Sequence, residues 1–560
     1  MSAGGRGFSR SLALAVVLSM SYATGAMAQE SDGTAPVHNS ETSQASGTDG
    51  SGEAASGDAD ATVTSDSSST DDTKARDSSK ASKGSGYGGR STGPSPLPLL
   101  PADPAYPVAS PPSNDALPAE VDVIEAWQPN VVCDPLDKPG LEAFGNLIGT
   151  TYGRANYSTS RMCIDQKSEH YDGRALDWPL NAGNPSDRRI GDSVAIWLTD
   201  NDGEMAKRLG IQSVIWNAHS WRPDGKGWQG YAGQSAHTDH MHFSFTWDGA
   251  MMRTSWWTGM ALEQVDQGPC AVVAGQYAAI PVGIRTEPCP TGLISAPDSG
   301  YDSVRPGGSG AGVALVQPLL GVKTTGTLDA GTRAALLTWQ DEKGIPQTGV
   351  MDQLTYAAAL GYNLPTIPEA GLAIPLADYM TTDYTPYKRV VLEQGSKGPG
   401  VEVLQTALGI DVDGSFGPAT AKALLEFTEE DPLLSANETT SALLWHQLEQ
   451  RDNPTLAYRE MTVADGDQGP AVVKAQELIG AEADGIFGPN TEKAVRAAQE
   501  KAGIEVTGLM DGPTWAALDP GAAKEKAAGK KKTSSKKAAD KATSAKDLRG
   551  GKVDPSTVRD

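Results

Sequence analysis

The chain has 560 residues, enough for several domains. Its formal net charge is −24 at pH 7, and an acidic body argues against nucleic acid as the main partner, because neutralising phosphates requires a basic face. A membrane span needs about 20 consecutive apolar residues, and no stretch of the sequence provides them.

The N-terminus has the pattern of an export signal. Arg6 and Arg10 provide positive charge, Leu12–Met20 forms a short apolar run, and the small residues at 26–28 provide a cleavage site. We therefore expect residues 1–28 to be a signal peptide and the mature protein to be secreted.

Residues 29–118 are expected to form a linker. Between Ser31 and Pro96 there is no Leu, Ile, Met, Phe or Trp, so this stretch cannot bury enough apolar surface to offset the entropy of ordering it. Frequent prolines between Pro94 and Pro118 favour extended polyproline II. We expect a disordered segment followed by an extended tether.

Aliphatic and aromatic residues become dense in residues 119–262, which we expect to form a folded domain. Apolar spacing predicts helices at 140–152 and 186–209, and a short strand at 214–216. Between 242 and 247 aromatic residues alternate with polar ones, as in a half-buried strand. Helices mixed with separated strands predict an α+β domain.

The four cysteines of an exported protein meet oxidising conditions, in which disulfides form. Proximity in the sequence pairs Cys133 with Cys163 and Cys270 with Cys289, although four cysteines allow three pairings. A metal site made of all four is the alternative, but their spacing lacks any Cys-x-x-Cys element. The second pair lies in a Pro/Gly-rich segment, residues 263–300, that we expect to be a linker.

A pattern recurs three times after this segment, at residues 301–362, 388–450 and 459–520. The second and third copies share Asp-Gly-x-Phe-Gly-Pro-x-Thr, at 413–420 and 484–491, whereas the first copy is divergent. Each copy is expected to fold as a helix, a glycine turn, a second helix, a loop and a short helix. Taken singly, such glycines only make turns and the Leu and Val positions only pack a small core.

As whole units, the copies resemble the three-helix peptidoglycan-binding domain of many wall hydrolases. The shared Asp-Gly-x-Phe-Gly-Pro-x-Thr segment carries this resemblance. The resemblance implies three small all-α repeats that bind peptidoglycan and anchor the protein to the wall, without a part in catalysis.

Residues that can carry chemistry concentrate in two segments, 168–177 and 237–242. A hydrolytic zinc site takes three protein ligands and leaves the last position to water. His170, Asp177 and one histidine of the later segment would supply such a mixed set of nitrogen and oxygen ligands.

Two histidines of the later segment compete for the third position. In an extended chain His240 and His242 point to the same face, while Met241 and Phe243 point into the core. One histidine can therefore bind the metal while the other reaches the attacking water. The alternative is a histidine cluster that only forms hydrogen bonds on a surface strand.

The pattern Ser-x-His-x-x-Gly-x-Ala-x-Asp, present at residues 168–177, is followed by His-x-His. This combination resembles the superfamily of lysostaphin, D-Ala-D-Ala carboxypeptidases and hedgehog signalling domains. The most similar branch is the D-Ala-D-Ala carboxypeptidase-like domain of actinobacterial wall proteins. The resemblance covers residues 121–257 and implies one zinc ion held by His170, Asp177 and His242.

The family also suggests which residues act on the substrate. Its general base stands either three residues before the last ligand, here Asp239, or at the first histidine of His-x-His, here His240. We rank Asp239 first, His240 second and His237 third; Asp239 is one methylene shorter than the family's glutamate. An upstream arginine holds the substrate's carboxylate or carbonyl in the family, for which Arg154 is the first candidate and Arg161 the alternative.

The last segment, residues 521–560, is rich in lysine and poor in large apolar residues, so we expect it to be disordered. It either keeps the protein soluble or contacts anionic wall polymers, an attraction that salt screens beyond roughly 10 Å.

Together these patterns predict a multidomain, wall-associated zinc peptidase that acts on peptidoglycan stem peptides or cross-links, as a carboxypeptidase or an endopeptidase. The alternatives are a catalytically inactive, metal-binding recognition module and a wall-bound scaffold whose repeats carry the function. The complete ligand set disfavours the scaffold. Nothing in the sequence separates the first two hypotheses, because fold does not determine function.

Overall fold

The computed structural model describes residues 97–125, 127–164, 168–233, 235–262 and 264–521. The expected signal peptide, the Ser/Gly/Asp-rich stretch and all but the first residue of the Lys-rich tail lie outside them. Within these ranges, no helix combines the length and apolar character that crossing a membrane requires.

The N-terminal half contains a five-stranded sheet in the order β1-β5-β2-β3-β4, in which every neighbouring pair is antiparallel. Strand β5 therefore lies between β1 and β2, and β1 is at one edge. The strands are β1 (Ala175–Pro179), β2 (Ile211–Trp216), β3 (His219–Trp221), β4 (Gln229–Gly230) and β5 (His240–Phe245).

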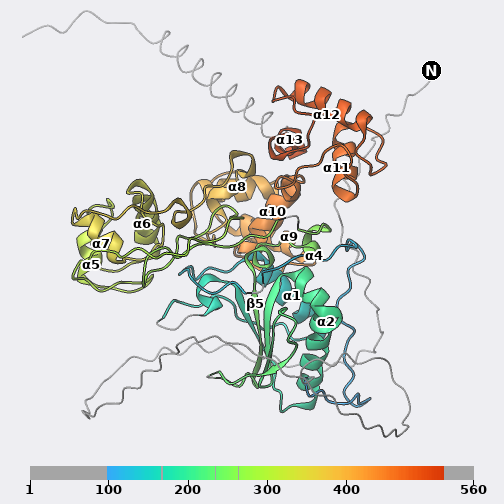
Figure 1. Ribbon diagram of the computed structural model, residues 1–560, viewed down its shortest axis with the longest axis horizontal. Coiled ribbons are helices and arrows are strands. Elements are labelled where there is room, and N and C mark those ends of the chain that lie inside the picture. Colours follow the sequence, from blue (N-terminus) through green and yellow to red (C-terminus); the bar gives the residue numbers. More distant parts are fainter. Residues whose placement is uncertain (1–96, 126, 165–167, 234, 263, 522–560) are drawn as a thin grey trace, which may run out of the picture. The chain divides into compact units, whose positions relative to one another are not determined.

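Helices α1 (Pro139–Tyr152) and α2 (Pro185–Leu209) share one hydrophobic core with the sheet, and Figure 1 shows both beside β5. The side chains of Phe243 and Phe245 are fully buried, and their rings pack edge-on against Phe144 of α1. Because side chains alternate along a strand, the residues between them face the other side of the sheet. A helix layer thus covers one face and leaves the second for polar groups.

The expected helices and both expected strands are present. The differences are the end of the last strand, two short helices after it and an interruption in α2. The last strand ends at Phe245, because the hydroxyl of Thr246 accepts a hydrogen bond from Gly249 N and caps helix α3 (Trp247–Ala250). Helix α4 (Ser255–Thr258) follows. Helix α2 is interrupted at residues 200–203, where three consecutive residues have positive φ.

The proline-rich segment at 97–118 is not a free tether. Leu97 is buried in the core of the domain, and Leu100 N donates to the Asp192 carboxylate on α2. The carbonyl of Pro98 accepts from Arg188 of the same helix. Extended proline-rich backbone leaves its carbonyls free, and the arginines of α2 provide the donors.

The C-terminal half is helical and has separate hydrophobic cores for three groups of helices. The expected linker at 263–300 joins the first of these cores through Cys270 and Val273. The groups are α5 (Ala311–Val316), α6 (Ala330–Glu342), α7 (Gln353–Ala359); α8 (Pro399–Leu408), α9 (Pro418–Glu430), α10 (Ala442–Asp452); and α11 (Pro470–Ile479), α12 (Pro489–Ala502), α13 (Gly512–Leu518).

Buried glutamines organise these groups. The side-chain amide of Gln476 donates to Asp484, to the carbonyl of Ile486 and to Thr491, and its oxygen accepts from Gly485 N. The same contacts at the same spacings form around the other glutamines of this type: Gln317, Gln340, Gln405 and Gln499. This glutamine pattern therefore occurs twice in the first and third groups and once in the second. Each buried side-chain amide finds the hydrogen-bond partners that burial requires.

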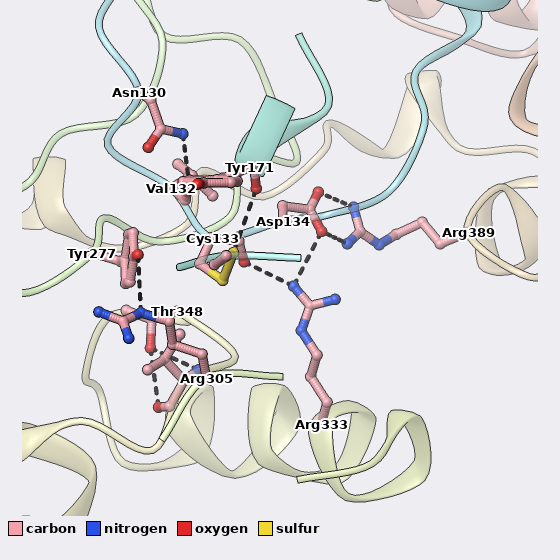
Figure 2. Close-up of a disulfide and its surroundings, with 12 residues drawn as sticks. Asn130, Val132, Cys133, Asp134, Tyr171, Tyr277, Arg305, Arg333, Thr348 and Arg389 are labelled. Atoms are coloured by element: carbon pink, nitrogen blue, oxygen red, sulfur yellow. Dashed lines mark hydrogen bonds and ion pairs between the residues drawn. A yellow bond between two sulfur atoms is a disulfide. The ribbon is translucent and has the colours of Figure 1, made fainter. Parts of the chain in front are cut away.

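A buried carboxylate joins the α/β domain to the helical half. Figure 2 shows Asp134 between Arg333 of α6 and Arg389, beside the Cys133 disulfide. Burial alone would raise the pKa of Asp134, but these two arginines and Lys138 outweigh it and hold the pKa well below its ordinary value. A carboxylate without these cations would be costly to bury.

Helix α1 also contacts α10. The side chains of Leu433 and Leu443 pack against the α/β domain, and Glu142 of α1 accepts a hydrogen bond from Leu443 N at 3.3 Å. Asn146, one turn further along α1, donates to the carbonyl of Leu433 at 2.8 Å. A titratable carboxyl group is thus enclosed in this contact.

Burial in this contact raises the pKa of Glu142 to about 7, from an ordinary 4.5. The folded protein therefore binds this proton more tightly than the unfolded chain, so the residue's contribution to the free energy of unfolding falls as the pH rises from about 4.5 to about 7. Glu142→Gln should remove this fall, worth at most about 3 kcal/mol. Urea denaturation at about pH 5 and about pH 8 measures it.

The exposed Glu120 provides the matched control, and Glu120→Gln should keep the pH dependence of the unmodified protein. An unchanged pH dependence in Glu142→Gln would show that this carboxyl group is not protonated in the folded protein.

Candidate metal centre

Three elements bring His170, Asp177 and His242 together. His170 lies on the 3₁₀ turn η1 (Glu169–Asp172), Asp177 on β1 and His242 on β5. All three residues are buried, and one potential ligand atom from each lies within 4.8 Å of the others. Of the residues that the structure describes, these three alone form such a group of His, Cys, Asp or Glu side chains.

The spacing of the motif at 168–177 has a local physical cause. The Ser168 hydroxyl accepts from His170 N and starts η1. Gly173 ends η1 with φ 72°, and a Cβ there would lie 2.1 Å from the carbonyl oxygen of Leu136. Only glycine fits both conditions, and the chain then enters β1 in the direction that presents Asp177.

The pairing of β1 with β5 places the second and third residues opposite each other. Asp177 faces His242 directly in the register, and Leu176 faces Phe243 on the opposite side of the sheet. Asp177 Oδ1 lies 2.8 Å from His242 Nδ1 and 3.3 Å from His170 Nε2. One carboxylate oxygen therefore meets both imidazoles.

Each imidazole has a second partner on its outer nitrogen. His170 Nδ1 contacts the carbonyl of Thr159, which can only accept, so Nδ1 carries the proton and Nε2 offers its lone pair. His242 Nε2 lies 3.0 Å from the hydroxyl of Ser244. Outer contacts of this kind orient histidines that bind metals.

The charge states also suit a divalent cation. Burial alone would raise the pKa of Asp177, but the close contacts of its carboxylate with the imidazoles of His170 and His242 outweigh it and hold the pKa well below its ordinary value. Burial lowers the pKa of His242 to about 4. At neutral pH the cluster is thus a carboxylate with a neutral His242, the forms that bind metal.

The three base candidates occupy different surroundings. The side chain of Asp239 is 81% exposed, and its Oδ1 accepts from His240 Nδ1 at 2.9 Å. His240 Nε2 consequently carries the lone pair and lies 3.5 Å from Asp177 Oδ1, at the cluster. The ring of His237 packs beside the rings of His240 and His242, and its Nδ1 contacts the carbonyl of Ser235.

The two arginine candidates are also separated. Arg154 forms an ion pair with Asp187 of α2 at 3.0 Å, and its guanidinium also donates to the carbonyl of Gly153. Arg161 contacts Asp177 Oδ2 directly, and its side chain is 52% exposed. The structure thus brings Arg161, the alternative of the sequence analysis, to the cluster and pairs Arg154 with α2.

Residues 158–161 support the cluster without being visible in the motif. The backbone of Ser158 pairs with that of Asp177, and Arg161 N donates to the carbonyl of His170. The segment is followed by Cys163, whose disulfide with Cys133 is present as expected, like that of Cys270 with Cys289. The sequence carries no signal for these backbone contacts. By contrast, the alternation along β5 places Ser244 on the same face as His242.

The fold and this cluster define an α/β domain with a buried site of two histidines and one carboxylate. Such a donor set, with two imidazole nitrogens and a carboxylate oxygen, fits Zn²⁺. The outer nitrogens of both imidazoles have partners, and the inner nitrogens converge on one carboxylate oxygen, so the residues present fit a bound cation.

Comparisons with known families agree with this division of the chain. Residues 138–242 match the family model of the VldE C-terminal domain, a range that includes the whole cluster. Residues 464–518 match the model of a peptidoglycan binding domain, which supports peptidoglycan as a partner and association with the wall. No curated protein and no solved structure matches the chain at a significant level.

If the cluster holds zinc, His170→Ala and His242→Ala should each abolish stoichiometric binding, because two ligands do not retain the ion. His219→Ala is the matched control, since His219 lies on β3 and its Nδ1 contacts the carbonyl of Asn217. Elemental analysis of the purified variants measures the zinc content. One equivalent of zinc in both ligand variants would refute the assignment.

Proposed function

We propose that this protein is a secreted zinc peptidase that cleaves the peptide part of peptidoglycan and attaches to the wall through its helical repeats. The observation that carries the proposal is the convergence of His170, Asp177 and His242, each with its outer partner in place. The sequence resemblance to zinc peptidases of the wall adds the reaction class, and the peptidoglycan-binding match adds the substrate.

A zinc ion held by these three residues would supply Lewis-acid chemistry, polarising the scissile carbonyl and lowering the pKa of the attacking water. His240 is positioned to take the proton from that water at Nε2. Its Nε2 carries a lone pair directed at the cluster, and only part of its side chain is exposed. We therefore assign His240 as the general base.

Asp239, which ranks first by sequence position, takes a different role in this proposal. Its carboxylate points into solvent and accepts from His240 Nδ1. That hydrogen bond fixes the tautomer of His240 and stabilises the imidazolium that forms when Nε2 accepts a proton. Asp239 thus orients the base.

Arg161 is our candidate for binding the substrate's carboxylate or carbonyl oxygen. Its guanidinium lies at the cluster and is half exposed, so it can contact a peptide that enters from solvent. Guanidinium groups bind carboxylates through two parallel hydrogen bonds. Arg154 is already paired with Asp187 and is assigned a structural role at the start of α2.

Wall attachment is assigned chiefly to the third repeat. Residues 464–518 carry the family match, and their core is separate from the others. The first two repeats contact the α/β domain, through Arg333 in one and Leu433 in the other. These contacts give the first two repeats a structural role as well.

Digestion of purified wall sacculi tests the activity. The zinc-loaded protein should release peptides with new amino termini, detected by mass spectrometry. His240→Ala should keep its zinc and lose about 10²–10⁴ in rate, the usual cost of removing a general base. Asp239→Asn should lose less, because the imidazole remains.

Two results would change this account. If Asp239→Asn abolishes cleavage while His240→Ala keeps full turnover, the two roles are exchanged. If the unmodified, zinc-loaded protein releases no wall peptide, the domain is a metal-binding recognition module.

Wall binding should be independent of the metal. The protein should sediment with sacculi with or without a chelator, and removal of residues 459–560 should abolish this. Removal of 522–560 alone is the control for the Lys-rich tail and should leave sedimentation unchanged. Loss of binding in the shorter deletion would assign wall attachment to the tail.

A further inference from the structure

Ser244 contacts the metal cluster although it is not one of the three candidate ligands. It lies on strand β5, two residues after His242, and is 2% exposed. Its hydroxyl oxygen lies 3.0 Å from His242 Nε2. A buried hydroxyl next to an imidazole nitrogen must form a hydrogen bond, because an unpaired polar group there is costly.

The ring of His242 turns one nitrogen toward the cluster and the other toward Ser244. Nδ1 lies 2.8 Å from Asp177 Oδ1 and Nε2 lies at Ser244, on the far side of the ring. A metal bound at Nδ1 uses the lone pair of that nitrogen, and a neutral imidazole carries one proton, so metal binding there requires the proton at Nε2. The Ser244 oxygen is the acceptor available for that proton.

The two histidines are held in opposite ways. His170 donates from Nδ1 to a backbone carbonyl and presents Nε2, whereas His242 presents Nδ1. The backbone carbonyl of Thr159 can act only as an acceptor. At His242 the same task falls to a side chain, which a single substitution can remove.

We propose that Ser244 is a positioning residue that holds the proton of His242 at Nε2 and thereby presents Nδ1 to the metal. This inference rests on the metal site that underlies the proposed function, and it does not depend on peptide cleavage. Zinc-loaded protein that cleaves no wall peptide would refute the peptidase and leave the role of Ser244 intact.

The sheet provides a matched control. Ser213 on β2 pairs with Ser244 in the register and is 3% exposed, whereas the hydroxyl at His242 Nε2 is that of Ser244. Ser213→Ala and Ser244→Ala therefore remove the same atom from the same buried layer. Ser244→Thr keeps the hydroxyl and tests whether it is the group that matters.

Zinc affinity of the full-length protein, measured by competition with a chromophoric chelator, is the first readout. Ser244→Ala should weaken binding about 10–100-fold, the usual effect of removing an outer partner of a ligand. Ser213→Ala should bind as the unmodified protein does, and Ser244→Thr should recover most of the affinity. Equal affinities for Ser244→Ala and Ser213→Ala, with both folded, would overturn the proposal.

A second readout needs no substitution. In unmodified, zinc-loaded protein labelled with ¹⁵N-histidine, NMR should show a protonated Nε2 and a metal-shifted Nδ1 for His242, and the reverse for His170. A metal-shifted Nε2 on His242 would overturn the proposal even if Ser244→Ala does not fold.

Discussion

The structure depends on one cross-strand pair, Asp177 opposite His242. Strands β1 and β5 are 65 residues apart at this pair, and a slip of either strand by one residue would turn its own member of the pair into the core. The register is secured on the opposite face, where Leu176 and Phe243 are fully buried against the helix layer. The polar cluster therefore exists because the apolar face of the same strands has only one way to pack.

The elements around this pair compensate for the cost of burying a carboxylate and two imidazoles. His170 is supplied by a short turn that a serine starts and a glycine ends. Residues 158–161 then contact two of the three candidate ligands through backbone and side chain, and the Cys133 disulfide ties the end of that segment to the irregular segment that leads into α1. Buried polar groups need such complete sets of partners, and here the set leaves one nitrogen of each imidazole facing the same carboxylate oxygen.

Much of this arrangement could be predicted from the sequence, and the failures have physical reasons. The alternation after His240 placed both late histidines on one face, but only the register with β1 shows that His242 meets Asp177. The exposure of Asp239 and the contact of Arg161 depend on side-chain directions that spacing does not encode. The proline-rich segment at 97–118 has a composition typical of a tether, yet the arginines of α2 bind its carbonyls. In each of these cases the outcome depends on contacts with residues that are distant in the sequence.

The central claim is that the buried cluster is a zinc site built from two imidazoles and one carboxylate. X-ray absorption at the zinc edge of the purified, zinc-loaded protein tests it most directly. The account predicts a four-coordinate ion with two nitrogen and two oxygen neighbours at about 2.0–2.2 Å and with imidazole multiple scattering. Sulfur neighbours at about 2.3 Å, or a shell made only of oxygen, would contradict it.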